Sequence, residues 1–75
     1  MAVKPAEAKP VYKIIELVGT SATSWEEAAR AAVETAAKTM TDLRVAEVTR
    51  LDMKIEDGKV VAFRARVSMS FKDSD

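Results

Sequence analysis

The feature that most constrains the fold is an apolar segment, Val11–Val18, that runs through Gly-Thr-Ser into an alanine-rich segment. Both faces of the apolar segment are largely hydrophobic, which predicts a short strand that is covered on two sides. Gly19 can adopt backbone angles that a β-carbon forbids, so we expect the chain to turn sharply there. Thr23 or Ser24 can cap a following helix, and Ser24 with Glu27 fits a capping box. The junction therefore predicts a strand that leads through a capped turn into a helix.

The predicted helix spans residues 24–42. Apolar and small residues at spacings of three and four mark one face of it, namely Trp25, Ala29, Ala32, Val33, Ala36 and Met40. The many alanines would let the helix axis lie close to a sheet. We expect Trp25, in the first helical turn, to pack in the core or at an interface.

Two further strands follow the helix. Along residues 44–56 the apolar side chains lie on one face of the strand before Thr49 and on the other face after Arg50. This change of face predicts a bulge or strong bend near Thr49–Arg50. Asp57-Gly58 is typical of a tight hairpin, and the last strand alternates cleanly, with its apolar face starting at Val61. The predicted fold is a β-α-β-β subunit of the α+β class, a three-stranded antiparallel sheet wrapped on one helix. The sheet face away from the helix is expected to carry Val45, Glu47, Leu51 and Arg64.

Composition limits both size and function. The 75 residues predict one domain at positions 11–72, with a flexible tail at 1–10 and a frayed end at 73–75. Without Cys or His, neither a disulfide nor a conventional zinc site can stabilise so small a core, so association between copies is expected. Twelve basic and twelve acidic residues balance, which argues against nucleic acid as a partner. No membrane-spanning run or secretory signal is evident, and we expect a cytoplasmic protein.

The residues that could carry chemistry are few. The absence of His and Cys removes the usual neutral-pH base and the strongest nucleophile, so we expect no enzymatic activity. Gly19-Thr20-Ser21 could hold an anion through free amides, but we interpret it as a capped turn. Carboxylates could bind calcium, which prefers oxygen ligands, especially where copies of one acid meet at a symmetry axis. The candidates are Glu47, Asp52, Glu56 and Asp57.

With these segments in place, the chain resembles the dodecin family over Val11–Lys72. The resemblance rests on four pieces: Val-Tyr-Lys-Ile-Ile-Glu-Leu-Val-Gly-Thr-Ser from Val11, Trp-Glu-Glu-Ala-Ala-Arg-Ala-Ala-Val from Trp25, Ile-Glu-Asp-Gly-Lys-Val-Val from Ile55, and Val-Ser-Met-Ser-Phe-Lys at the end of the last strand. It implies a subunit of which twelve copies build a hollow homododecamer. It also implies a storage protein that binds flavins, riboflavin or FMN, inside that shell.

At the two positions that match the family's flavin contacts, this sequence departs from the pattern. Val45 stands at the place of the stacking tryptophan, and Arg64 at that of the hydrogen-bonding glutamine. Valine offers no flat ring, and an arginine only donates hydrogen bonds, so both changes argue against a flavin sandwich. Arg64 could instead attract a phosphate or carboxylate, or pair with Glu47 or another acid across an interface. The alternative function is a flavin-free variant that binds a cation (calcium) or an anion between subunits, or that serves as a scaffold.

Overall fold

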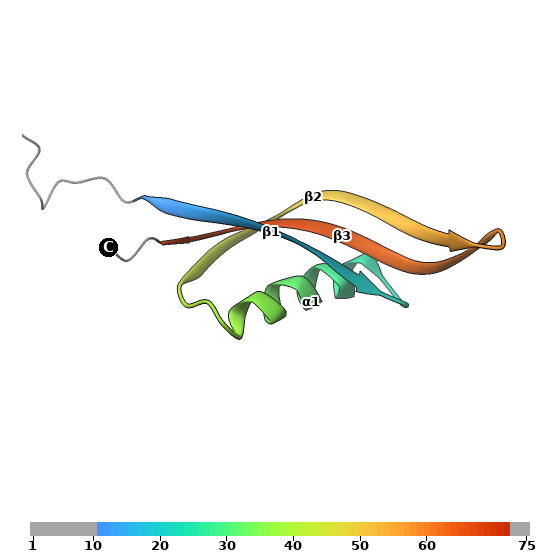
Figure 1. Cartoon of the computed structure of the whole chain (residues 1–75), viewed down its shortest axis with the longest axis horizontal. Coiled ribbons are helices and arrows are strands. Elements are labelled where there is room, and N and C mark those ends of the chain that lie inside the picture. Colours follow the sequence, from blue (N-terminus) through green and yellow to red (C-terminus); the bar gives the residue numbers. More distant parts are fainter. Residues whose placement is uncertain (1–10, 73–75) are drawn as a thin grey trace, which may run out of the picture.

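The computed structural model describes residues 11–72 and contains one helix packed on one face of a three-stranded sheet (Figure 1). The elements in chain order are β1 (Tyr12–Ser21), α1 (Trp25–Ala37), β2 (Leu43–Glu56) and β3 (Lys59–Lys72). The strand order is β1-β3-β2, and both pairs are antiparallel, which confirms the predicted β-α-β-β architecture. The tail and the frayed end predicted at 1–10 and 73–75 lie outside the described residues.

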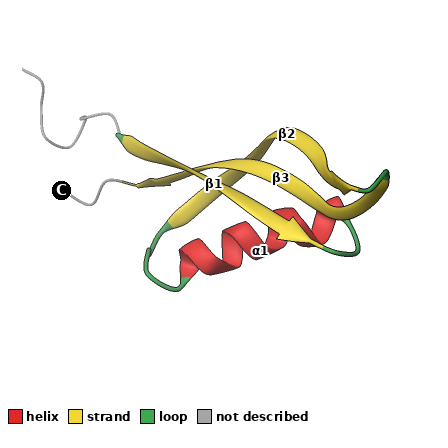
Figure 2. Ribbon diagram, turned by 45° about the vertical axis from the view of Figure 1, so that its right-hand side comes forward, coloured by secondary structure: helices red, strands yellow, loops and turns green. Residues whose placement is uncertain are grey.

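The core is small, and its buried residues come from α1 and the middle strand β3. Figure 2 shows the helix lying along one face of the sheet. Small residues of the helix meet the inward face of β3, so the helix axis lies close to the sheet, as its alanine content predicted. The buried side chains are Ala28, Ala32 and Ala36 from α1 and Ala65, Val67 and Met69 from β3. Ile15 and Leu17 of β1 and Val33 of α1 pack at its margin.

Gly19 serves close packing and not a turn, which corrects the expectation from sequence. It lies inside β1, opposite Ala65, and it is buried. Among the described residues only Gly58 is a glycine with positive φ. A β-carbon at Gly19 would overlap the carbonyl oxygen of Ala28 and would lie 2.9 Å from its carbonyl carbon and 3.1 Å from the amide nitrogen of Ala32. The glycine therefore lets β1 touch the helix backbone.

The helix begins with the predicted cap. Ser24 has extended backbone angles, and its side chain accepts a hydrogen bond from the amide of Glu27 at 3.0 Å. The second half of the capping box is different, because the Glu27 carboxylate accepts hydrogen bonds from Thr23 Oγ1 at 2.6 Å and Ser21 Oγ at 3.2 Å. These bonds fasten the first helical turn to the end of β1.

Replacing the cap should weaken the fold measurably. We expect Ser24→Ala to lower the free energy of unfolding by about 1 kcal/mol, because the amide of Glu27 loses its acceptor. Chemical denaturation at one fixed protein concentration measures the change. Thr23→Ala, which removes a contact to Glu27 but leaves the cap, is the control and should have a smaller effect. Equal effects of the two variants would contradict the assignment of Ser24 as the cap.

The ends of two elements differ from the prediction. The helix ends at Ala37, not at residue 42, and Asp42 has a left-handed φ of 62° that directs the chain into β2. Met40 consequently lies beyond the helix, where its amide still bonds to the carbonyl of Ala36. Strand β1 runs to Ser21 and not only to residue 18, because β3 continues to pair with it as far as Phe63.

The long hairpin of β2 and β3 contains the predicted bulge and two further irregularities. The register shifts between Val48 and Arg50, as the change of apolar face indicated. Shifts between Leu43 and Val45 and between Lys54 and Ile55 were not predicted. The tip is the expected tight turn, with φ of 52° at Asp57 and 74° at Gly58.

The single helix leaves much apolar surface uncovered. The hairpin tip projects past the helix, and every residue from 51 to 60 is exposed (Figure 1). Side chains that are at least 40% exposed include Ile14 at 66%, Val45 at 62% and Ile55 at 61%. Within the described part of the chain, no helix has the length and apolar composition needed to cross a membrane.

Candidate ligand-binding face

The side of the sheet away from α1, here called the open face, carries the candidate site residues. Residues directly opposite each other on antiparallel strands share a face, so the register arranges this surface in cross-strand rows. From one end to the other these rows are Ile14–Ser70–Val45, Glu16–Ser68–Glu47, Val18–Arg66–Arg50 and Thr20–Arg64–Asp52. Leu51 was expected here, but it lies opposite Ala65 and so belongs to the helix side.

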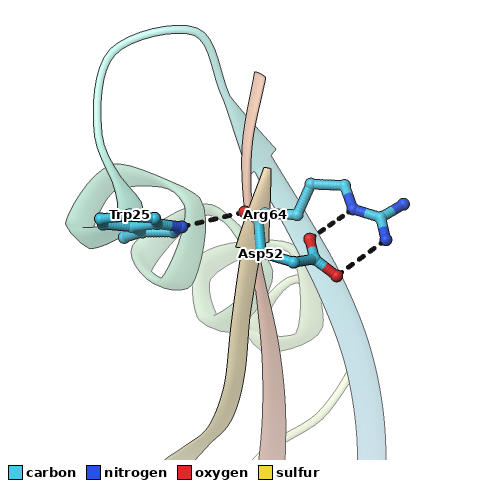
Figure 3. Close-up of polar contacts among 3 residues, drawn as sticks. All are labelled: Trp25, Asp52 and Arg64. Atoms are coloured by element: carbon cyan, nitrogen blue, oxygen red, sulfur yellow. Dashed lines mark hydrogen bonds and ion pairs between the residues drawn. The ribbon is translucent and has the colours of Figure 1, made fainter. Parts of the chain in front are cut away.

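Arg64 forms the best-defined polar contact on the open face. Its Nε donates to Asp52 Oδ1 at 2.7 Å and its Nη2 donates to Asp52 Oδ2 at 2.9 Å, a bidentate pair drawn in Figure 3. Within the chain, the acidic partner of Arg64 is therefore Asp52 and not Glu47. Both oxygens of Asp52 and one edge of the guanidinium are thereby engaged.

The strand that carries Asp52 is also contacted by Trp25, from the side opposite the ion pair. Trp25 donates from Nε1 to the carbonyl oxygen of Asp52 at 3.0 Å, and its ring meets Phe63 edge-on with centroids 5.2 Å apart. Figure 3 shows the indole and the Arg64–Asp52 pair on opposite sides of the hairpin. Trp25 is half-buried, lies outside the buried core cluster, and contacts the backbone that carries the ion pair.

The ion pair should make stability sensitive to acid. The hydrogen bonds from Arg64 hold the pKa of Asp52 below its usual value of 3.8, and Asp52 in turn raises the pKa of Arg64. A carboxyl with a depressed folded-state pKa stabilises the fold above its unfolded value, and this stabilisation is lost as the pH falls through the folded value.

We therefore expect the melting temperature to fall as the pH drops below about 4, the ordinary value for an aspartate. In Asp52→Asn this fall in melting temperature at acid pH should be smaller. Hydrogen bonds from Thr23 and then Ser21 lower the pKa of Glu27 as well, so Glu27→Gln is a second, separable variant. Melting curves between pH 6 and pH 3 provide the measurement. If the melting temperature of Asp52→Asn falls with acid pH as much as that of wild type, the ion pair does not contribute to the acid sensitivity.

Val45 and Arg64, the two positions predicted for ligand contact, do not meet within one subunit. Their rows are centred on Ser70 and Arg64 of β3, which are six residues and thus roughly 20 Å apart. The hollow beside Val45 has a volume of about 110 Å³ and is lined by Val33, Leu43, Arg44, Val45, Ala46 and Met69. Ligand pockets usually measure about 300–1,000 Å³, so this hollow is small for a ligand site.

The predicted metal candidates are also dispersed. Glu47 and Asp52 lie two rows apart, and Glu56 lies next to the hairpin turn, where it pairs with Lys54 at 3.4 Å. Within residues 11–72, no three acidic side chains gather closely enough to hold a metal ion.

Comparison with known proteins agrees with this fold. The family model for dodecin matches residues 11–73. Calcium dodecin of Mycobacterium tuberculosis is 44% identical over 62 residues, which cover 83% of this chain and 87% of the relative. Its crystal structure, described as that of a calcium-chelating antigen with a novel calcium-binding site, superposes with a TM-score of 0.76 at 45% identity, covering 84% of this chain and 90% of the other. Dodecin from Streptomyces coelicolor gives a TM-score of 0.84 at 32% identity, with 91% and 97% covered.

One helix packed on one face of a three-stranded antiparallel sheet defines a class of small β-α-β-β proteins. The family match and these relatives make the assignment specific: the chain belongs to the dodecin family. The resemblance derived from the sequence is thereby confirmed.

Proposed function

We propose that twelve copies of this chain form a hollow shell that binds and stores a small ligand between subunits and catalyses no reaction. The observation that carries this proposal is the separation of Val45 from Arg64 on an open face with exposed apolar side chains. A ligand site built from these positions is incomplete in one subunit and requires another. Membership of the dodecin family supports the same arrangement.

Flavin is the ligand that the family resemblance implies, and two features predict that it binds weakly here. Val45 provides no ring to stack on the isoalloxazine, and the Arg64 guanidinium is held by Asp52. A glutamine both donates and accepts hydrogen bonds, whereas Arg64 has only donors left to offer.

A second candidate function is calcium binding, favoured by the similarity to a relative named calcium dodecin. Of the candidates Glu47 and Asp52, Glu47 is the more available, because both oxygens of Asp52 accept from Arg64. Calcium takes six to eight oxygen ligands, so copies of Glu47 would have to converge at a subunit interface.

Ligand titrations separate these candidates. Riboflavin fluorescence should be quenched weakly or not at all by micromolar protein, and a strong quench would restore flavin as the ligand. A rise in melting temperature with calcium, absent with magnesium and lost in Glu47→Gln, would favour the second function. Native mass spectrometry of the purified protein should show a retained small molecule if the shell stores one. An assembled shell that retains no ligand and responds to none would contradict both functions.

A further inference from the structure

Three arginines gather on one part of the open face around a single acid. Arg50 lies directly opposite Arg66, and in the next row Arg64 lies opposite Asp52. The two rows are two residues apart on β3, about 7 Å, which is within reach of long side chains. Three guanidiniums beside one carboxylate leave two net positive charges. These four residues are here called the arginine cluster.

The bulge in β2 creates this cluster. The register shifts between Val48 and Arg50, so Thr49 is left out of the ladder and Arg50 lies on the open face. Without the extra residue, Arg50 would lie opposite Ala65 on the helix side. Thr49 donates from Oγ1 to the carbonyl oxygen of Arg66 at 3.2 Å, which ties the bulge to β3. Bulges are frequent next to active sites, where they change the direction of a side chain.

The two paired arginines are not neutralised within the chain. None of the ion pairs found across residues 11–72 includes Arg50 or Arg66, and both residues are exposed. The pKa of Asp52 is lowered first by its hydrogen bonds with Arg64, and the charges of Arg66 and Arg50 lower it further. Both oxygens of Asp52 already accept from Arg64, however. Because like charges directly opposite each other destabilise a sheet, the arginine pair costs stability.

Arg64 is oriented by its own ion pair. Its Nε and Nη2 donate to Asp52, which fixes the plane of the guanidinium. A guanidinium has more N–H groups than these two bonds use, and Figure 3 shows the third nitrogen pointing away from the carboxylate. Arginine presents its donors in a rigid fork that matches the geometry of a phosphate group. The free edge of Arg64 is therefore held in place for an anion.

We infer that the arginine cluster binds a phosphate group. Arg50 and Arg66 pair with its charge, and Arg64 donates to it from the next row. A phosphate monoester carries about two negative charges at neutral pH, which the net charge of the cluster balances. The row on the other side of Arg66 holds Glu16 and Glu47, which repel an anion. The phosphate therefore lies between the arginine pair and Arg64.

The inference rests on the proposed function in one respect, because it makes the stored ligand a phosphate, free or esterified. The cluster itself lies within one chain. Phosphate binding can therefore be measured whether or not a shell forms, so the two proposals can fail separately. A shell that binds no phosphate contradicts only the inference, and a single chain that binds phosphate contradicts only the shell.

Calorimetric titration of the whole protein with inorganic phosphate, in a chloride buffer, provides the test. Wild type should bind phosphate, and binding should weaken with rising salt but persist at physiological ionic strength. Arg50→Gln and Arg66→Gln should each weaken binding at least about tenfold, because each removes charge-assisted hydrogen bonds. Arg30→Gln on the exposed side of α1 removes the same charge and should bind as wild type does. Wild type that binds no phosphate, or an equal loss in Arg30→Gln, would overturn the inference.

Stability and copy number distinguish a ligand site from a structural role. Removing one of two opposed like charges should leave the melting temperature of Arg50→Gln and Arg66→Gln unchanged or higher in phosphate-free buffer. Native mass spectrometry should give both variants the wild-type copy number. A lower melting temperature or a lost assembly would assign these arginines to acids of another copy, which would reject the phosphate site and leave the shell intact.

A sugar phosphate identifies the source of the phosphate group. Tighter binding of ribose 5-phosphate than of inorganic phosphate would support an esterified phosphate as the ligand, and equal binding would support free phosphate. Ribose lacks the phosphate and should not bind. If ribose binds as tightly as ribose 5-phosphate, the protein recognises the sugar and the inference is wrong.

Discussion

Gly19→Ala is expected to destabilise the subunit by about 3 kcal/mol or more, at the upper end of what an overpacked methyl group costs. The added β-carbon would collide with the Ala28 carbonyl group and crowd the amide of Ala32, which are backbone atoms of the helix. No side-chain rotation relieves such an overlap, so α1 would have to move away from β1. Thermal and chemical denaturation at a fixed protein concentration measure the loss.

The chain has one other glycine, which provides a matched control. A β-carbon at Gly58 meets nothing within 4 Å, but the residue has a φ of +74°. Gly58→Ala should therefore cost only the left-handed conformation, roughly 1–2 kcal/mol. Trimming Ala28 to glycine should not rescue Gly19→Ala, because the obstructing atoms belong to the backbone. Rescue by that change, or a Gly19→Ala protein as stable as wild type, would contradict the close packing of β1 on α1.

Val45→Trp combined with Arg64→Gln is expected to raise affinity for riboflavin by about 100-fold. The indole restores a flat stacking surface worth ~1–3 kcal/mol, judged from the stacking of bases on aromatic side chains. A glutamine hydrogen bond adds ~0.5–1.5 kcal/mol, and about 2.7 kcal/mol corresponds to a factor of 100. Quenching of riboflavin fluorescence by assembled protein is the measurement.

The two single variants show how much each substitution contributes to the gain in riboflavin affinity. Val45→Trp alone should recover most of it, since the ring supplies most of the new contact area. Arg64→Gln alone should recover little, and it leaves Asp52 without its bidentate partner. If the assembled double variant quenches no better than wild type, then Val45 and Arg64 do not occupy the flavin-contact positions.

Much of the fold followed from local rules. The capping serine, the Asp-Gly turn and the alternation along β3 each specify one element, and all three are found in place. The role of Gly19 was predicted wrongly, because a glycine is compatible with either an unusual backbone conformation or a close contact, and the sequence does not distinguish the two. The helix end was misplaced by five residues: α1 stops at Ala37, whereas Asp42 has a left-handed φ and directly precedes β2.

The Arg64–Asp52 pair was missed for a reason of register. Counting back from the two-residue turn places Leu51 opposite Arg64, and that was the expected face of Leu51. The shift between Lys54 and Ile55 leaves Val61 unpaired and moves the ladder by one residue, which brings Asp52 to Arg64 instead. A shift of one residue in the register exchanges the two faces of a strand. Where a bulge has no sequence signature, the cross-strand contacts beyond it therefore cannot be predicted from the sequence.

The central claim is that one helix covers one side of this sheet and that further copies must complete the other. Native mass spectrometry at micromolar concentration tests it most directly. A twelve-subunit assembly is the predicted result, with few or no free subunits. A cooperatively folded protein that remains a single chain of 8.2 kDa at that concentration would contradict the claim.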